Sequence, residues 1–117
     1  IDRKTGKTTT VAGTGTAGRT DGPSLMATFN GPFGINVDKN NNIYVADLGS
    51  HSMRMIKPNK QVITIGGKRS TGNTLGGIGT SAFYNPTDMD IDDNGNIYLT
   101  DMSNQRIIKI TPVLKTP

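Results

Sequence analysis

Short stretches in which apolar and polar residues alternate recur along the chain, and each stretch is bounded by Gly, Asn, Asp or Pro. Val, Ile, Tyr and Thr dominate them, as in antiparallel strands of about five to seven residues. The pattern predicts strands over residues 33–38, 42–47, 52–57, 61–66, 87–92, 96–101 and 105–110. Asn and Gly between several of these strands suit tight hairpin turns, so we expect an all-β fold of antiparallel sheets.

The strands belong to an internal repeat with a period of 54 residues. A shift by that period places residues 32–38 (PFGINVD) over 86–92 (PTDMDID) and residues 42–47 (NIYVAD) over 96–101 (NIYLTD) without a gap. It also places Phe29 over Phe83, where each Phe is expected to pack under a Gly-rich loop. A register kept over this length predicts two copies of one supersecondary unit.

Each unit is predicted to be a four-stranded sheet, and the two ends of the chain are out of phase with the units. A strand expected over residues 7–13 aligns with the fourth strand at 61–67, whereas the second unit has no fourth strand because two prolines interrupt residues 111–117. We therefore expect three segments: 1–13, the outer strand of a preceding or partner sheet; 14–67, a complete unit with its entry loop; and 68–117, a second unit that lacks its outer strand.

These motifs resemble the NHL repeat of β-propeller proteins. The resemblance lies in residues 32–38 and 42–47, while the name-giving triplet has changed to Ser-His-Ser at 50–52 and Asn-Gln-Arg at 104–106. It implies four-stranded blades, usually six around a central channel. Two blades do not close such a ring. The missing blades are expected either from a longer protein of which this chain is a fragment, or from a homotrimer of six blades if the chain is complete.

Composition narrows the function classes. The 117 residues include 15 Gly, 6 Pro and no Cys, and all nine acidic residues are Asp. A helical bundle is disfavoured, and disulfides, thiolate metal clusters and thiol catalysis are excluded. No apolar run approaches the roughly 18 residues of a membrane span. Since the chain begins at Ile1 without a targeting segment, we interpret it as a mature product, an excised domain or a fragment, and we assign no compartment.

Two motifs resemble ligand-binding loops but lack essential parts. Residues 13–18 spell Gly-x-Gly-x-x-Gly, yet a dinucleotide site needs this loop to open a helix, which residues 19–23 (RTDGP) do not favour. Residues 92–96 (DDNGN) begin like a calcium loop, but Ile97 and Ser103 occupy the positions of the required Gly and Glu. We therefore expect both segments to be structural turns.

Candidate catalytic chemistry is sparse. His51 is the only histidine, and the aligned position in the second unit holds Gln105. Nucleophilic catalysis needs a base oriented by a third group, so we assign no catalytic residue, no metal ligand and no cofactor. The resemblance does include lyases and lactonase-type enzymes that bind metals with channel-facing side chains. The channel-facing candidates here are Asn36, Asp88 and Asp90.

The resemblance implies a recognition role, since NHL propellers commonly bind proteins and some bind single-stranded RNA on a basic face. The candidate binding residues, on loops expected at one end of the ring, are Arg19, His51, Lys68, Arg69 and Asn104. The leading hypothesis is a non-catalytic scaffold for a protein or peptide partner, with no membrane partner. One alternative is RNA or polyanion binding, favoured by a net charge of +4, with Phe33 or Tyr84 as the exposed aromatic for base stacking. The other alternative is a metal-dependent lyase or hydrolase of propeller type.

Overall fold

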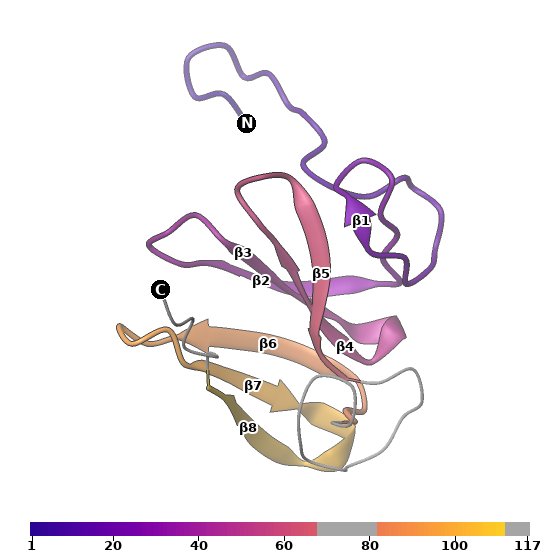
Figure 1. The fold of residues 1–117 in the computed structure, drawn as a ribbon, viewed down its shortest axis with the longest axis vertical. Helices are drawn as coiled ribbons and strands as arrows, with labels where there is room; N and C mark the ends of the chain where they lie inside the picture. Colours follow the sequence, from indigo (N-terminus) through magenta and orange to yellow (C-terminus); the bar gives the residue numbers. More distant parts are fainter. Residues whose placement is uncertain (68–81, 112–117) are drawn as a thin grey trace.

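The computed structural model describes residues 1–67 and 82–111, which form two antiparallel sheets (Figure 1). One sheet has the order β1-β5-β4-β3-β2, and the other has the order β6-β7-β8. Their bounds are β1 Gly22–Pro23, β2 Pro32–Val37, β3 Ile43–Asp47, β4 Ser52–Ile56, β5 Gln61–Gly66, β6 Pro86–Ile91, β7 Ile97–Asp101 and β8 Arg106–Ile110. We call strands β2–β5 blade 1 and strands β6–β8 blade 2.

Each of the seven strands predicted from the alternating pattern is present within one residue of its predicted bounds. Short 3-10 turns, η1 (Leu48–Ser50) and η2 (Met102–Asn104), join β3 to β4 and β7 to β8. No helix in the described part of the chain is long and apolar enough to cross a membrane.

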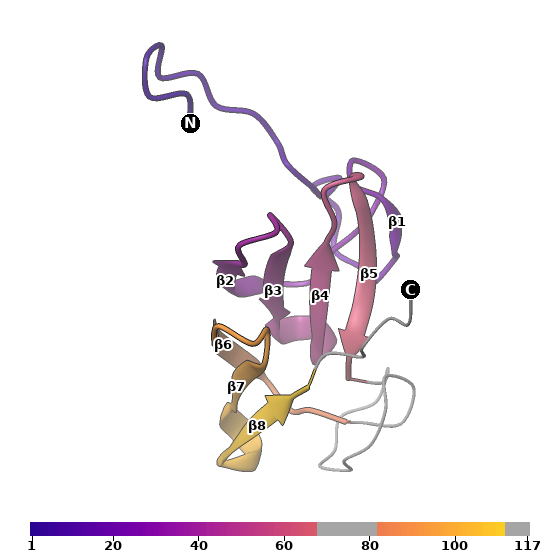
Figure 2. The same cartoon turned by 60° about the vertical axis from the view of Figure 1, so that its left-hand side comes forward.

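Residues 7–13, predicted as the outer strand of a preceding or partner sheet, form no strand within this chain. A strand persists only where a neighbour completes its ladder, and the outer edge of β5 is occupied instead by β1, with Gly22 opposite Val62. The N-terminal residues run away from both sheets (Figures 1 and 2). Residues 7–13 therefore add no strand to either sheet of their own chain.

An aspartate at the same repeat position stabilises the inner hairpin of each blade. Asp38 accepts hydrogen bonds from the backbone N–H groups of Asn40 and Asn42 at 2.8 and 2.9 Å, and from the Tyr44 hydroxyl at 3.0 Å. Asp92 accepts the matching bonds from residues 94, 96 and 98 at 2.9–3.3 Å. Burial opposes the charge on Asp38, but the hydrogen bonds outweigh it and lower its pKa below the ordinary 3.8. The oxygens that resemble calcium ligands thus serve the turn itself.

The two blades pack face to face around a shared apolar core (Figure 2). Its buried members are Tyr44, Ala46, Met53, Phe83, Met89, Ile97, Leu99 and Ile108. Phe83 is 1% exposed, and a Cβ added at Gly66 would lie 3.0 Å from its ring, so the glycine leaves space for the aromatic ring. The expected packing role of this Phe is therefore found between the blades.

The inner strands β2 and β6 lie side by side, one from each blade (Figure 1). A Cβ added at Gly34 would stand 2.4 Å from the Thr87 carbonyl oxygen, a distance that backbone atoms cannot accommodate. Two residues along, the Asn36 side-chain amide donates a hydrogen bond to the Asp90 carboxylate at 3.2 Å. Glycine thus allows the close approach, and a polar pair spans it.

Candidate binding face

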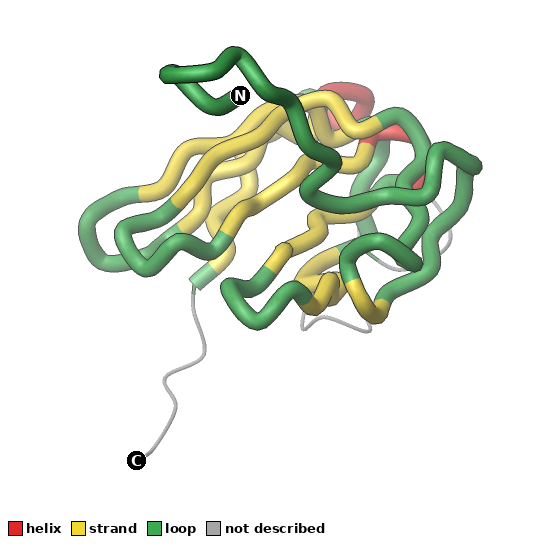
Figure 3. The backbone as a smooth tube through the Cα atoms, turned by 90° about the horizontal axis from the view of Figure 1, so that it is seen from above, coloured by secondary structure: helices red, strands yellow, loops and turns green. Residues whose placement is uncertain are grey.

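The turns that follow β3 and β7 lie at the same end of the two blades (Figure 3). We call this end the loop face and define it by residues 48–51, 84–85 and 102–105. Backbone hydrogen bonds hold each turn to the segment that enters the inner strand, as between Ser103 N–H and the Tyr84 carbonyl at 3.0 Å. The loop face is therefore a fixed surface rather than a set of independent loops.

A buried aspartate anchors this end of each blade. Asp47, with no exposed surface, accepts a hydrogen bond from the backbone N–H of Asn30 at 2.9 Å. Asp101, equally buried, accepts one from the backbone N–H of Tyr84 at 2.7 Å. Each backbone bond thus ties the end of the second strand to the segment before the inner strand, and side chains of the following turn, such as Ser50 at 2.5 Å, also contact the carboxylate.

Each aspartate is paired with an arginine that sequence reasoning missed. Arg54 is fully buried, donates to Asp47 at 3.3 Å and to the Thr28 carbonyl at 2.8 Å, and lies 4.7 Å from the centre of the Phe29 ring. Arg106 donates to Asp101 at 2.8 Å and to the Ala82 carbonyl at 3.0 Å.

The two arginines contact equivalent atoms from non-equivalent positions. The carbonyls at 28 and 82, like the two aspartates, are related by the 54-residue shift, whereas Arg54 aligns with Ile108 and Arg106 aligns with Ser52. The repeat alignment therefore does not predict that each arginine pairs with the buried aspartate of its blade. An arginine two residues earlier along the strand reaches the same partners because both positions point to one face of the sheet.

His51 joins the two blades. Its Nδ1 atom accepts a hydrogen bond from the backbone N–H of Asn85 at 3.0 Å, and its ring meets the Tyr84 ring edge-on at 5.5 Å. Nδ1 must be unprotonated to accept this bond, which places the ring proton on Nε2. The His51 side chain thus positions the entry to β6, and its acceptor nitrogen is occupied.

Apolar side chains remain exposed on the loop face. Tyr84 is 42% and Met102 is 53% exposed, and the Ser103 bond to the Tyr84 carbonyl fixes the two segments against one another. Phe33, at the start of β2, is 71% exposed, so both aromatics named from the sequence as exposed candidates are exposed. Aromatic and Met side chains of this kind are typical of protein recognition surfaces.

The remaining candidate binding residues lie at different places. Asn104 is on the loop face, where its side chain donates to Asp101 at 2.9 Å, whereas the Arg19 guanidinium donates to the Gly67 carbonyl. Lys68 and Arg69 lie outside the described residues, so their role stays a prediction.

The channel-facing candidates do lie together on the adjoining inner strands. Asn36 and Asp90 are hydrogen-bonded to one another, and the backbone of Asp88 lies beside Gly34. Within residues 1–67 and 82–111, no three His, Cys, Asp or Glu side chains come close enough to hold a metal ion together.

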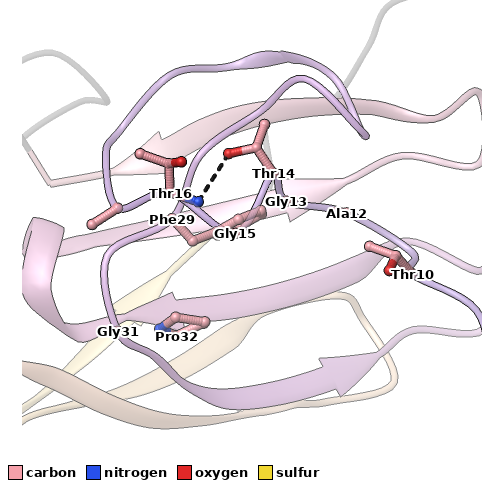
Figure 4. Close-up of a pocket in the computed structure, with 10 residues that line it drawn as sticks. Thr10, Ala12, Gly13, Thr14, Gly15, Thr16, Phe29, Gly31 and Pro32 are labelled. Atoms are coloured by element: carbon pink, nitrogen blue, oxygen red, sulfur yellow. Dashed lines mark hydrogen bonds between the residues drawn. The ribbon is translucent and has the colours of Figure 1, made fainter.

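Residues 13–17 of the Gly-rich segment line a cavity of about 550 Å³ (Figure 4). No helix follows it, as the sequence predicted, so the requirement for a dinucleotide site is not met. The backbone N–H of Thr16 is taken by the Thr14 hydroxyl at 3.1 Å. A Cβ at Gly18 would lie 2.6 Å from the Thr28 hydroxyl, so this glycine serves packing.

Residues 83–110, which comprise blade 2 and the segment that enters it, match the model of the NHL repeat. The chain therefore contains an NHL repeat. Among curated proteins, it is 33% identical over 94 residues to NHL repeat-containing protein 2 of Homo sapiens, covering 77% of this chain and 13% of that protein. It is 35% identical over 81 residues to the probable peptidyl-α-hydroxyglycine α-amidating lyase pgal-1 of Caenorhabditis elegans, covering 67% of this chain and 22% of that protein.

Two solved structures share the fold of the chain. An auxiliary nutrient binding protein from Bacteroides ovatus is 26% identical, with a TM-score of 0.74 over 85% of this chain and 27% of that one. Another from Bacteroides thetaiotaomicron is 24% identical, with a TM-score of 0.77 over 92% of this chain and 30% of that one. The chain thus spans less than a third of each of these relatives. Over the residues that the structure describes, it has the all-β architecture expected for two NHL propeller blades, with four strands in blade 1 and three in blade 2.

Proposed function

We propose that this NHL-repeat chain is part of a non-catalytic binding scaffold whose loop face takes a protein or peptide partner. The observation that supports this most directly is the rigid support beneath its exposed apolar side chains. The backbone of Tyr84 is held by Asp101 and Ser103, and its ring rests against His51. Because the backbone of these turns is already held and loses little entropy on binding, such a surface favours binding.

The polar groups of the loop face also favour binding over catalysis. Ser50 donates to Asp47, Asn104 donates to Asp101, and His51 Nδ1 accepts from the Asn85 backbone. These bonds stabilise the turns and leave no nucleophile paired with an oriented base among these side chains.

Selection of a phage-displayed random peptide library on the immobilised chain tests the proposal. Recovered peptides are titrated by calorimetry against the wild type, a Tyr84→Ala/Met102→Ala variant, and a Leu25→Ala control whose side chain is also exposed, at 60%. We expect the double variant to lose at least tenfold in affinity and the control to keep it. Equal binding by all three proteins, or no enriched peptide, would refute the loop face as the binding surface.

A titration with RNA distinguishes the polyanion alternative from peptide binding. Single-stranded RNA is titrated at several salt concentrations, because phosphate contacts give an affinity that falls steeply with added salt. RNA binding with that salt dependence, combined with no peptide enrichment, would favour the polyanion function over the proposed one.

A lyase function is the second candidate, favoured by the 35% identity to a protein named as a peptidyl-α-hydroxyglycine α-amidating lyase. Asn36, Asp88 and Asp90 would then line the channel where substrate binds. Incubation with a peptidyl-α-hydroxyglycine substrate and added divalent metals tests it. Release of the amidated peptide, reduced by Asp90→Asn, would support the lyase over the scaffold.

A further inference from the structure

The loop that enters blade 1 covers the outer edge of that blade (Figure 2). We call residues 20–28, which contain β1, the covering segment. The Gln61 carbonyl faces the β4 side, where it accepts the Lys57 N–H, so residues 60, 62 and 64 direct their backbone groups to the other side of β5. The covering segment supplies a partner at each of these positions: the Ser24 N–H, which donates to the Lys60 carbonyl at 2.9 Å; Gly22, opposite Val62; and the Asp21 carboxylate, which accepts the Thr64 N–H at 3.0 Å.

The covering segment offers little to a further strand. β1 has only two residues, and because Gly22 pairs toward β5, the backbone groups of Pro23 point away from β5. Pro23 has no N–H, and its carbonyl accepts the N–H groups of Met26 and Ala27, both at 2.9 Å. Short edge strands and proline are among the means by which proteins keep sheets from pairing edge to edge. The five-stranded sheet therefore ends at Pro23 without a backbone donor.

A buried arginine holds the covering segment in place. Arg54, which has no exposed surface, donates to the Asp21 carboxylate at 2.7 Å. It also donates to the carbonyls of Thr20 and Thr28, at 3.0 and 2.8 Å. The Thr28 N–H closes the loop by donating to the Thr20 carbonyl at 3.0 Å, and Ala27, also without exposed surface, packs in the apolar cluster of blade 1. The segment is thus fixed by both polar and apolar contacts.

The strand beneath this segment has the composition of one that pairs readily with copies of itself. The six residues of β5, QVITIG, carry no charge and no Pro, and four of them are β-branched. Short uncharged segments of high β-propensity are those that associate when their edge is exposed. An uncovered β5 would therefore be a site of strand addition.

The repeat itself does not require this arrangement. In the second unit, the positions aligned with Asp21, Pro23 and Arg54 hold Leu75, Gly77 and Ile108. Strands β6, β7 and β8 nevertheless form an antiparallel sheet without these three side chains. Their combination in the first unit therefore indicates a role beyond building the blade.

We propose that the covering segment prevents β5 of a second copy from adding to β5, and that the Asp21 carboxylate keeps the segment closed. Its Oδ1 atom accepts from Arg54 while its Oδ2 atom accepts the Thr64 N–H, so one side chain both anchors the segment and covers an edge donor. Release of Asp21 would uncover the outward groups of β5. Two identical antiparallel edges satisfy one another, which is why the occupant is a second copy.

Light scattering after size exclusion compares Asp21→Ala with the wild type at the same concentration. We expect Asp21→Ala to have at least twice the mean mass of the wild type, because its β5 edge is uncovered. Asp21→Asn keeps an oxygen that accepts the Thr64 N–H, so its mass should stay near that of the wild type. Asp93→Ala is the matched control, since it removes an exposed carboxylate from the inner hairpin of blade 2.

Hydrogen exchange followed by NMR at low concentration shows whether the edge opens while the sheet stays folded. The Thr64 N–H bonds the covering segment, whereas the Ile63 N–H points toward β4, where Met55 lies opposite. We expect exchange in Asp21→Ala to be faster at Thr64 and unchanged at Ile63. Faster exchange at both residues would instead show that this variant unfolds.

A second variant keeps the link between Asp21 and Arg54 and so does not depend on the fold of Asp21→Ala. Pro23→Val gives the outer edge of β1 a backbone N–H, and its mean mass should exceed that of the wild type. Pro58→Val makes the same chemical change in the turn between β4 and β5, and its mass should not rise.

The proposal is overturned if Thr64 exchanges faster in Asp21→Ala while the mass equals that of the wild type, because the open edge then recruits no strand. Unchanged exchange at Thr64, or an equal rise in mass in Asp93→Ala, would also contradict it. If Asp21→Ala unfolds, equal masses of Pro23→Val and Pro58→Val overturn the proposal.

Discussion

Truncation of Phe83 measures how far the two blades depend on one another. Phe83 is 1% exposed and lies in the core cluster shared by both sheets, where glycines 66 and 67 leave room for its ring. Replacing a buried Phe by Ala removes its transfer free energy and leaves a cavity, which costs about 3–5 kcal/mol. Phe33→Ala makes the same chemical change at a side chain that is 71% exposed, so it should cost about 0.5 kcal/mol or less.

Urea unfolding followed by circular dichroism compares the two variants with the wild type. With a slope of about 1–3 kcal/mol per molar urea, the loss predicted for Phe83→Ala lowers the midpoint by roughly 1–5 M or unfolds the chain outright. Phe33→Ala should leave the midpoint nearly unchanged. Equal midpoints for the two variants would refute the assignment of Phe83 to a core that both blades share.

Three further predictions follow from the same contacts. The folded pKa of Asp38 lies below 3.8, so the ionised carboxylate stabilises the folded state above about pH 4, and this stabilisation is lost as the pH falls through the folded pKa. The urea midpoint of the wild type should therefore fall as the pH is lowered across this range. The midpoint of Asp38→Asn should fall less steeply. His51→Ala leaves the Asn85 N–H without its partner and should lower the unfolding free energy by about 1–3 kcal/mol, whereas His51→Gln, the residue found at the aligned position, should recover part of that loss in the same urea assay. Gly34→Ala would place a Cβ 2.4 Å from the Thr87 carbonyl oxygen, so it should lower the urea midpoint by forcing β2 and β6 apart; an unchanged midpoint would contradict the close approach of the two strands.

Local patterns predicted most of the fold because each strand carries its own signal. The alternating residues 42–47 and 96–101 both form strands, although their repeated tyrosines differ: Tyr44 is buried, as a core aromatic should be, whereas Tyr98 is 39% exposed. The turn residues are equally local, since Asp38 bonds groups two to six residues away. Features that depend only on near neighbours are readable from one sequence.

Features set by contacts between distant segments were not predicted. The residues next to Arg54 in the sequence do not indicate its contacts with Asp21 at 2.7 Å and with the Thr28 carbonyl. The repeat alignment does not indicate them either, because the second arginine, Arg106, lies two residues earlier in its unit. The role of His51 also escaped prediction, because its partner lies 34 residues away in the other blade. The strand expected over residues 7–13 had the right local pattern, but it has no neighbour within its own chain.

Departures from the repeat mark where the two blades are not interchangeable. Gly34 permits the backbone of β2 to approach β6, and the residue aligned with it, Asp88, lies on the other side of the same contact, because a Cβ added at Gly34 would stand 2.9 Å from the Asp88 Cα and 3.1 Å from its Oδ1 atom. The close approach therefore requires a glycine on the strand of blade 1 but not at the aligned position of blade 2. The repeat alignment by itself does not show which of the two positions needs the glycine.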